Sequence, residues 1–153
     1  MVVQAFAVSI RPNLAEKTKR LDSGDRAINE EVEKGLLVLI EPDLNVREAL
    51  TLLLQSKGWA IRAVTSCEEL SATIGQGGLT AVISESTLPN CTAQDILELC
   101  SAQAVPVVFT GHDLPLQGAV DLIRQGAMDF LDKPFPQARL LDLLERLLNR
   151  QNG

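Results

Sequence analysis

Two carboxylates, a hydroxyl and an ammonium group each stand at the end of a separate, mostly apolar run of the sequence. These residues are Glu41, Glu85, Thr110 and Lys133. A carboxylate can attack a phosphoryl group when Mg²⁺ and a lysine hold the phosphoryl oxygens, and the metal itself needs acidic ligands. Two acids and one lysine therefore offer either part of a phosphoryl-transfer site or a structural ion pair.

Five apolar runs alternate with segments of helical periodicity, and they determine where the four residues should lie. The runs cover residues 36–40, 60–64, 80–84, 106–110 and 128–132. Such runs predict strands covered by helices on both faces, and short connections between βα units favour parallel pairing. We therefore expect an α/β fold with a doubly wound five-stranded parallel sheet. Sites in such sheets lie beyond the carboxyl ends of the strands, where all four residues fall.

Three pairs of residues have the spacing of a helix-capping box, and two glycines stand where helices should end. The pairs are Asn45 with Glu48, Ser66 with Glu69, and Thr92 with Asp95, and the glycines are Gly58 and Gly126. The fourth predicted helix carries an apolar stripe that should face the sheet, formed by Leu116, Ala119, Val120 and Ile123.

From about residue 36 to residue 148 the sequence resembles the receiver domain of response regulators, the phosphoaspartate switch of two-component signalling. The resemblance rests on Glu41 after the first run, Val-Val-Phe-Thr-Gly with Thr110, and Lys133-Pro134-Phe135 with Phe130 three residues before the lysine. Ile83-Ser84-Glu85-Ser86-Thr87-Leu88-Pro89 fills the window of the family's phosphoacceptor aspartate. The resemblance implies a flavodoxin-like (βα)5 topology with strand order 2-1-3-4-5.

Two positions depart from the family pattern. Glu85 stands in place of the acceptor aspartate, and Pro42 replaces the second of two adjacent acids, which usually coordinates Mg²⁺. Asp43 follows and can add charge to an acidic pocket with Glu41. However, Glu41 and Arg47 keep the family spacing, so no one-residue shift is indicated. We therefore expect no metal-ligand set, weak or absent Mg²⁺ binding and no cofactor.

Glu85 has two interpretations. A glutamate carries about one negative charge whereas a phosphoryl group carries nearly two, so Glu85 would mimic only part of its pull on Thr110 and Lys133. In the family, the hydroxyl at the Thr110 position moves towards the phosphate and the aromatic ring at the Phe130 position turns inward. Glu85 is then either a constitutive, active-like mimic or an acid that only satisfies Lys133 in a scaffold that no longer switches.

The leading functional hypothesis is a stand-alone pseudo-receiver, an atypical response regulator that acts by protein–protein interaction with Glu85 in place of the phosphoacceptor. The alternative is a functional phosphorelay receiver that accepts a phosphoryl group from a histidine kinase. No nucleophile–base pair or cofactor loop is recognisable, so we do not expect an enzyme. Because the chain ends soon after the last predicted helix, output should pass through a histidine kinase, another regulator or a similar partner.

Two segments are candidates for a homodimer contact. The helix predicted at residues 138–149 should cover the sheet with four leucines and has two further leucines that widen its apolar arc. The covering residues are Leu140, Leu143, Leu144 and Leu147, and the further ones are Leu141 and Leu148. Residues 1–34 form a charged arm, partly helical or disordered, before a receiver-like domain at 35–150. In the arm, Leu14, Leu21 and Ile28 recur every seven residues, which fits either a seam with a partner helix or a solvated segment.

The composition fits one small domain in a reducing compartment. The chain has 153 residues, 46% of them hydrophobic, and a net charge of −6 that disfavours nucleic acid as a partner. Three cysteines, Cys67, Cys91 and Cys100, form no Cys-x-x-Cys pair. We therefore expect neither a disulfide framework nor a zinc site, and we interpret Cys91 as an unreactive loop thiol. The apolar residues 1–10 end at Arg11-Pro12, so they predict no signal peptide and no membrane span, and we expect a cytoplasmic protein.

Overall fold

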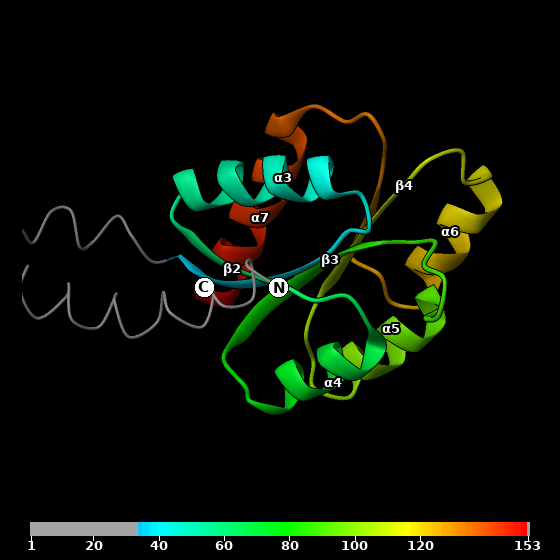
Figure 1. The fold of residues 1–153 in the computed structure, drawn as a ribbon, viewed down its shortest axis with the longest axis horizontal. Helices are drawn as coiled ribbons and strands as arrows, with labels where there is room; N and C mark the ends of the chain where they lie inside the picture. Colours follow the sequence, from blue (N-terminus) through cyan, green and yellow to red (C-terminus); the bar gives the residue numbers. More distant parts are fainter. Residues whose placement is uncertain (1–33, 153) are drawn as a thin grey trace, which may run out of the picture.

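The computed structural model describes residues 34–152, in which strands and helices alternate along the chain (Figure 1). The strands are β1 (Gly35–Ile40), β2 (Trp59–Ala63), β3 (Leu79–Glu85), β4 (Val107–Gly111) and β5 (Asp129–Asp132). The helices are α3 (Leu44–Ser56), α4 (Cys67–Gly75), α5 (Ala93–Ser101), α6 (Leu116–Arg124) and α7 (Gln137–Asn152). All neighbouring strands are parallel, in the order β2-β1-β3-β4-β5, so the predicted fold class and strand order are confirmed.

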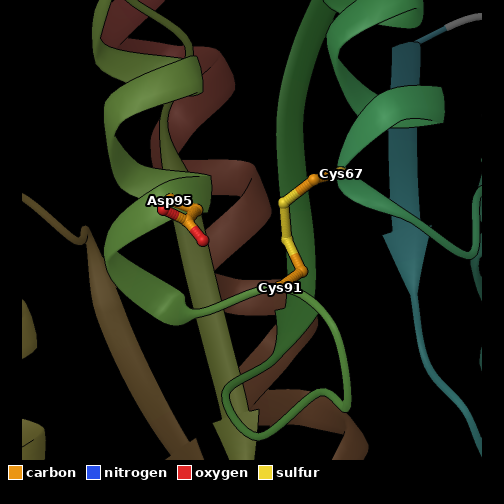
Figure 2. A group of neighbouring side chains, drawn as sticks. All are labelled: Cys67, Cys91 and Asp95. Carbon is orange, nitrogen blue, oxygen red and sulfur yellow. A yellow bond between two sulfur atoms is a disulfide. The ribbon is translucent and has the colours of Figure 1, made fainter.

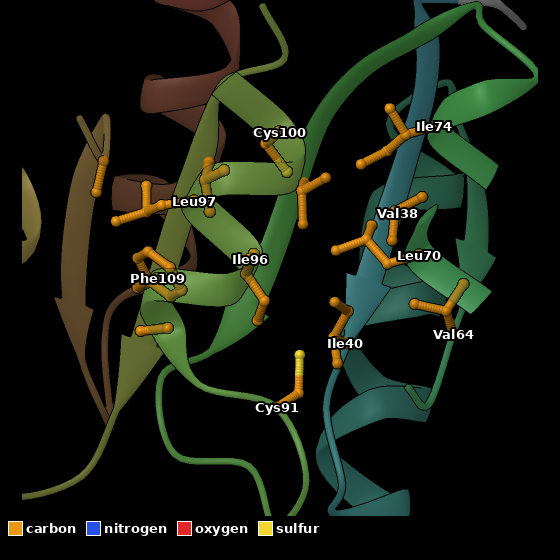
Figure 3. Close-up of a cluster of buried hydrophobic side chains, with 14 of the residues drawn as sticks. Val38, Ile40, Val64, Leu70, Ile74, Cys91, Ile96, Leu97, Cys100 and Phe109 are labelled. Carbon is orange, nitrogen blue, oxygen red and sulfur yellow. The ribbon is translucent and has the colours of Figure 1, made fainter. Parts of the chain in front are cut away.

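Two hydrophobic clusters, one on each face of the sheet, hold the layers together. Successive residues of a strand point to opposite faces, so Val38 and Ile40 enter one cluster and Leu37 and Leu39 enter the other. Helices α4, α5 and α6 cover the first face, and α3 and α7 cover the second (Figure 1). Figure 3 shows the first cluster, where side chains of α4 and α5 meet those of the central strands. Because apolar side chains fill both faces of the sheet, polar side chains that could act chemically lie at the ends of the strands.

Strand register brings the carboxyl ends of the strands to one level. Glu85 pairs with Thr110 between β3 and β4, and Ile40 pairs with Ser84 between β1 and β3. Glu41 therefore leaves β1 beside the end of β3. At the next strand, the Lys133 amide donates a hydrogen bond to the Gly111 carbonyl at 2.7 Å, and a cis peptide bond joins Lys133 to Pro134.

Two of the three predicted helix caps are confirmed and one is wrong. Ser66 accepts a hydrogen bond from the Glu69 amide at α4, and Thr92 forms a complete capping box with Asp95 at α5. At α3 the N-cap is Asp43, whose Oδ1 accepts from the amides of Asn45 and Val46, so Asn45 lies inside the first turn. Both residue types cap helices well, and the backbone direction after β1 selects the earlier one.

The apolar stripe predicted for α6 does not face the sheet as a whole. The Leu116 residue is 81% exposed and Ile123 is 45% exposed, whereas Leu122 is buried in the first cluster. Leu114, in the loop before the helix, packs against this cluster, and a Cβ placed on Gly118 would lie 3.2 Å from its Cδ1. Leu114 therefore covers the position that sequence periodicity assigned to Leu116.

The leucines of α7 mostly pack inside the domain. The four predicted covering leucines are all buried in the second cluster, and Leu141 and Leu148 are half-buried and pack against the same cluster. The wide apolar arc is therefore largely explained by intramolecular packing, which weakens the argument for a dimer through this helix. Neither α7 nor any other helix in residues 34–152 combines the length and hydropathy that crossing a bilayer requires.

The structure overturns the prediction that the cysteines stay unpaired. Cys67, the first residue of α4, forms a disulfide with Cys91, which lies in the loop between β3 and α5 (Figure 2). The two residues are 24 positions apart in sequence, but their Cα atoms are only 5.8 Å apart. Parallel pairing of β1 with both β2 and β3 brings the loops after β2 and β3 together, which spacing alone does not reveal. Cys100 remains a free, buried thiol, and burial raises its pKa to about 12.

Removing residues 1–33 should leave the domain folded. The predicted arm lies outside the described residues except for Lys34, whose amide donates to the Gly58 carbonyl and whose ammonium pairs with Glu145 at 2.7 Å. Among the described residues, those from Gly35 onward already form both hydrophobic clusters. We expect the midpoint of thermal unfolding of a chain starting at Lys34 to change by no more than about 2 °C. A larger loss would show that the arm stabilises the domain.

Candidate functional site

The carboxyl edge of the sheet carries the four polar residues singled out in the sequence. Glu41 follows β1, Glu85 is the last residue of β3, Thr110 lies in β4 opposite Glu85, and Lys133 follows β5. Glu41, Glu85 and Thr110 are buried although they are polar. Burial of this kind is stable only when the polar groups have partners.

Lys133 forms the centre of the site because it bridges both carboxylates. Its Nζ lies 2.5 Å from Glu41 Oε1 and 2.6 Å from Glu85 Oε1, and the exposed fractions of the three side chains are 8%, 3% and 10%. Burial on its own lowers the pKa of Lys133, but the hydrogen bonds and charges of Glu41 and Glu85 act more strongly and raise this pKa above its ordinary value. The three groups together carry one net negative charge.

Backbone amides complete the coordination of the two carboxylates. Glu85 Oε2 accepts from the amides of Ser86 at 3.1 Å and Thr87 at 3.4 Å, and the Ser86 amide also donates to the Thr110 carbonyl at 2.8 Å. Glu41 Oε2 accepts from the Asp43 amide at 3.0 Å. Each carboxylate therefore has one oxygen on Lys133 and the other on the chain, which holds it in a single orientation.

Phe130 reaches the same edge of the sheet from β5. The ring is half-buried and packs against the first cluster. A Cβ placed on Gly111 would lie 3.2 Å from Phe130 Cζ, 3.3 Å from Glu85 Oε2 and only 2.6 Å from Ser86 Oγ. The tip of the ring and the Glu85 carboxylate thus both lie close to Gly111, and a larger residue there would first displace the Ser86 hydroxyl.

Asp43 does not join this group. It is exposed, and its Oδ1 accepts from the two amides at the start of α3. Arg47, one turn into that helix, donates from Nη1 to the Glu41 carbonyl at 2.9 Å and so holds the chain at the end of β1. The amides of Ser86 and Thr87 and the close approach at Gly111 had no sequence signal, because backbone groups and free space are not encoded by residue type.

The charges of Lys133 and Glu85 should be strongly coupled. Lys133→Met leaves two buried carboxylates without a counter-charge and should lower the free energy of unfolding by about 3–5 kcal/mol. Glu85→Gln leaves Lys133 paired with Glu41 and should cost only about 1–3 kcal/mol. In the double variant, Glu41 and Glu85 no longer repel each other. The loss of unfolding free energy in the double variant should therefore be smaller than the sum of the two single losses by at least about 1 kcal/mol, measured in a urea double-mutant cycle.

The exposed ion pair between Arg146 and Asp142 on α7 is the matched control, because both side chains are more than half exposed. Disrupting it with Arg146→Ala should change the free energy of unfolding by no more than about 0.5 kcal/mol. Equal effects at the two sites would contradict the assignment of Lys133 as a buried bridge.

Comparison with known proteins identifies a protein family for this chain. A family model for the response regulator receiver domain matches residues 37–145. The phosphoglycerate transport system transcriptional regulatory protein PgtA of Salmonella typhimurium is 32% identical over 121 residues, which cover 76% of this chain and 29% of PgtA. The transcriptional regulatory protein FixJ of Bradyrhizobium diazoefficiens is 30% identical over 121 residues, covering 76% of this chain and 58% of FixJ. The chain thus spans less than two thirds of either relative's length.

A solved structure supports the fold. The crystal structure of a two-component response regulator from Clostridium difficile superposes with a TM-score of 0.72 at 21% sequence identity, covering 78% of this chain and 100% of that one. At that identity the likeness concerns the fold alone. The family model, however, matches most of the chain, and the matched range of residues 37–145 contains all four polar residues of the site. The chain therefore belongs to the response regulator receiver domain family, the signalling domains of two-component systems.

Proposed function

We propose that this receiver domain is a pseudo-receiver, a cytoplasmic signalling module that works by protein–protein interaction and without an aspartyl phosphate. The observation that carries the proposal is the contact set of Glu85. One carboxylate oxygen binds Lys133 and the other binds two loop amides. A charged acceptor therefore already occupies the end of β3 and engages the loop that follows it.

The position of Phe130 favours the active-like mimic over the inert scaffold. Its ring tip and the Glu85 carboxylate both lie against Gly111. A carboxylate has two acceptor oxygens where a phosphoryl group has three, so Glu85 is only a partial mimic. Both oxygens of Glu85 nevertheless accept hydrogen bonds, one from the Lys133 ammonium and the other from the amides of Ser86 and Thr87. These bonds are enough to hold the loop in one arrangement.

The donor set does not fit Mg²⁺, which supports a mechanism without the metal. Magnesium requires near-octahedral oxygen coordination and usually takes one or two free carboxylates. Here Lys133 lies between Glu41 and Glu85, the Pro42 side chain has no ligand atom, and the Asp43 carboxylate caps α3. A metal ion would have to displace a buried ammonium, at the cost of leaving that ammonium unpaired.

The exposed apolar face of α6 is the surface that best suits a protein partner. Leu116 and Ile123 are exposed on one side of the helix, and large exposed apolar residues that cluster are typical of interaction sites. A groove of about 380 Å³ beside α6 is lined by Ser86, Thr87 and Leu114, among others. Because Ser86 and Thr87 also hold Glu85, the groove lies between the loop that holds Glu85 and α6; Leu116 and Ile123 do not line it. We propose that a signalling protein, a histidine kinase or another regulator, docks here.

Phosphodonors should not modify the protein. After incubation with acetyl phosphate and Mg²⁺, mass spectrometry of the intact chain should show no phosphoryl adduct, because the attacking carboxylate is paired and the metal ligands are missing. The matched control is Glu85→Asp combined with Pro42→Asp, which should gain Mg²⁺-dependent labelling. A stable adduct on Glu85 or Asp43 of the unmodified sequence would instead support the functional phosphorelay receiver.

The mimic and the inert scaffold differ in how far a change at Glu85 spreads. Under the mimic, Glu85→Gln removes the charge that holds the loop amides, so NMR resonances of the Phe130 ring and the α6 amides should shift together with those of Ser86 and Thr87. Glu145→Gln is a control, since Glu145 is an exposed acid that pairs with Lys34. Shifts confined to residues adjoining Glu85 would contradict the mimic and support the scaffold.

A partner contact through α6 can be tested with Leu116→Glu. In binding assays against purified histidine kinases and response regulators of the source organism, this change should weaken a specific complex at least about tenfold, because it places a charge in an apolar contact. Leu52→Glu is the matched control, since Leu52 is 67% exposed on α3, which packs on the opposite face of the sheet. Equal loss with both variants, or no binding to any member of the panel, would contradict the proposal.

A further inference from the structure

The disulfide between Cys67 and Cys91 lies at the border of the first hydrophobic cluster, in the loop that begins next to Glu85. Cys67 begins α4, and Cys91 comes six residues after Glu85 in the loop between β3 and α5 (Figure 2). The two hydrophobic clusters already cover both faces of the sheet. A core of that extent makes a permanent covalent staple unnecessary for folding, so the position of the bond calls for another explanation.

The disulfide constrains the same loop that holds Glu85. That loop starts with Ser86 and Thr87, whose amides donate to Glu85 Oε2, and ends at Thr92, the N-cap of α5. Between these two anchors, Cys91 ties the loop to the start of α4. Breaking the bond removes the covalent attachment just before Thr92, so the loop is held there only by its packing and by the cap of α5, and its amides should open more often.

The two sulfurs differ in access, as expected of an attacking and a resolving thiol. Cys67 is half-buried and lines a groove of about 510 Å³ between α4 and α5, together with Asn90 and Glu98. Cys91 is buried, with 5% of its surface exposed. A small thiol-reactive molecule therefore reaches Cys67 first, and Cys91 can then attack only the sulfur next to it.

We propose that Cys67 and Cys91 form a reversible thiol–disulfide pair whose oxidation holds the loop between β3 and α5 in the arrangement that binds Glu85. The oxidant is a low-molecular-weight disulfide of the glutathione type. The Cys67 thiolate attacks one of its sulfurs and releases one thiol, and the Cys91 thiolate then attacks Cys67 and releases the second. Two electrons pass from the cysteines to the small disulfide, and the two protons of the cysteine thiols end on the two released thiols.

A metal site is the competing use of the same residues and is less well supported. The Asp95 carboxylate and the two sulfurs lie within 4.8 Å of one another (Figure 2). However, Asp95 Oδ2 already accepts from the Thr92 amide in the capping box of α5, and a structural zinc site takes four protein ligands. Within residues 34–150 the cluster offers three, and the sulfurs are bonded to each other.

The redox poise of the full chain is the first test. Protein equilibrated in glutathione buffers of graded composition is quenched in acid, unfolded and treated with N-ethylmaleimide. The bonded form should take up one maleimide, at Cys100, and the reduced form three. We expect the reduced form when reduced glutathione is in large excess and the disulfide when glutathione disulfide dominates. A pair that stays bonded, or stays reduced, across the whole series would overturn the proposal, as would reduced protein that binds Zn²⁺ and resists oxidation.

Hydrogen exchange tests the effect on the loop. Amides of residues 86–88 and 90–92 should exchange at least about fivefold faster in the reduced protein than in the oxidised protein. Cys67→Ser and Cys91→Ala should both exchange at the fast rate under either condition. Cys100→Ala, which leaves the pair intact, should keep the difference. Equal exchange in both redox states of the unmodified chain would overturn the proposed constraint, and because no partner is involved, this result is independent of the docking surface on α6.

Discussion

One ammonium group held between two buried carboxylates governs the carboxyl edge of this protein. Lys133, Glu41 and Glu85 leave the sheet from three different strands, and only in-register parallel pairing lets their side chains meet. Each acid is costly to bury alone, and so is the lysine. The bridge therefore restrains the ends of β1, β3 and β5 relative to one another. The hydrogen bond from the Lys133 amide to Gly111 places the lysine on that line through the backbone as well.

One loop links this bridge to the surface of the domain. Glu85 directs its second oxygen at the amides of Ser86 and Thr87, and those residues also line the groove beside α6. Further along the same loop, Cys91 is bonded to the start of α4. The loop thus has an electrostatic anchor near its start and a covalent one near its end, and it lines the groove beside α6. Both anchors therefore attach to the same short segment of the chain.

Periodicity and capping chemistry predicted most of the fold but failed where two local solutions were nearly equal. Apolar runs identified all the strands of residues 34–152 to within a residue or two, because strands covered on both faces leave no polar alternation. Ser66 and Thr92 were predicted as caps, whereas Asn45 was preferred to Asp43, a residue of similar capping strength. On α6 the periodic stripe was real, but Leu114 packed in its place and left Leu116 in solvent. Which residue caps a helix, or which leucine packs beside it, depends on the path of the neighbouring loop. A loop has no sequence periodicity from which that path can be predicted.

By itself, the sequence determined the parallel α/β class and the strand ends at which Glu41, Glu85, Thr110 and Lys133 fall. These follow from residue type and spacing along the chain, whereas the departures at Glu85 and Pro42 are visible only against the pattern of the receiver family that the sequence resembles. Tertiary structure alone decided that Lys133 binds both acids at once, that Asp43 turns away to cap α3, and that the Phe130 ring tip and the Glu85 carboxylate both lie close to Gly111. It also decided that Cys67 meets Cys91. Each of these depends on distances between residues far apart in the chain, which are set by strand order and register and are invisible to local patterns.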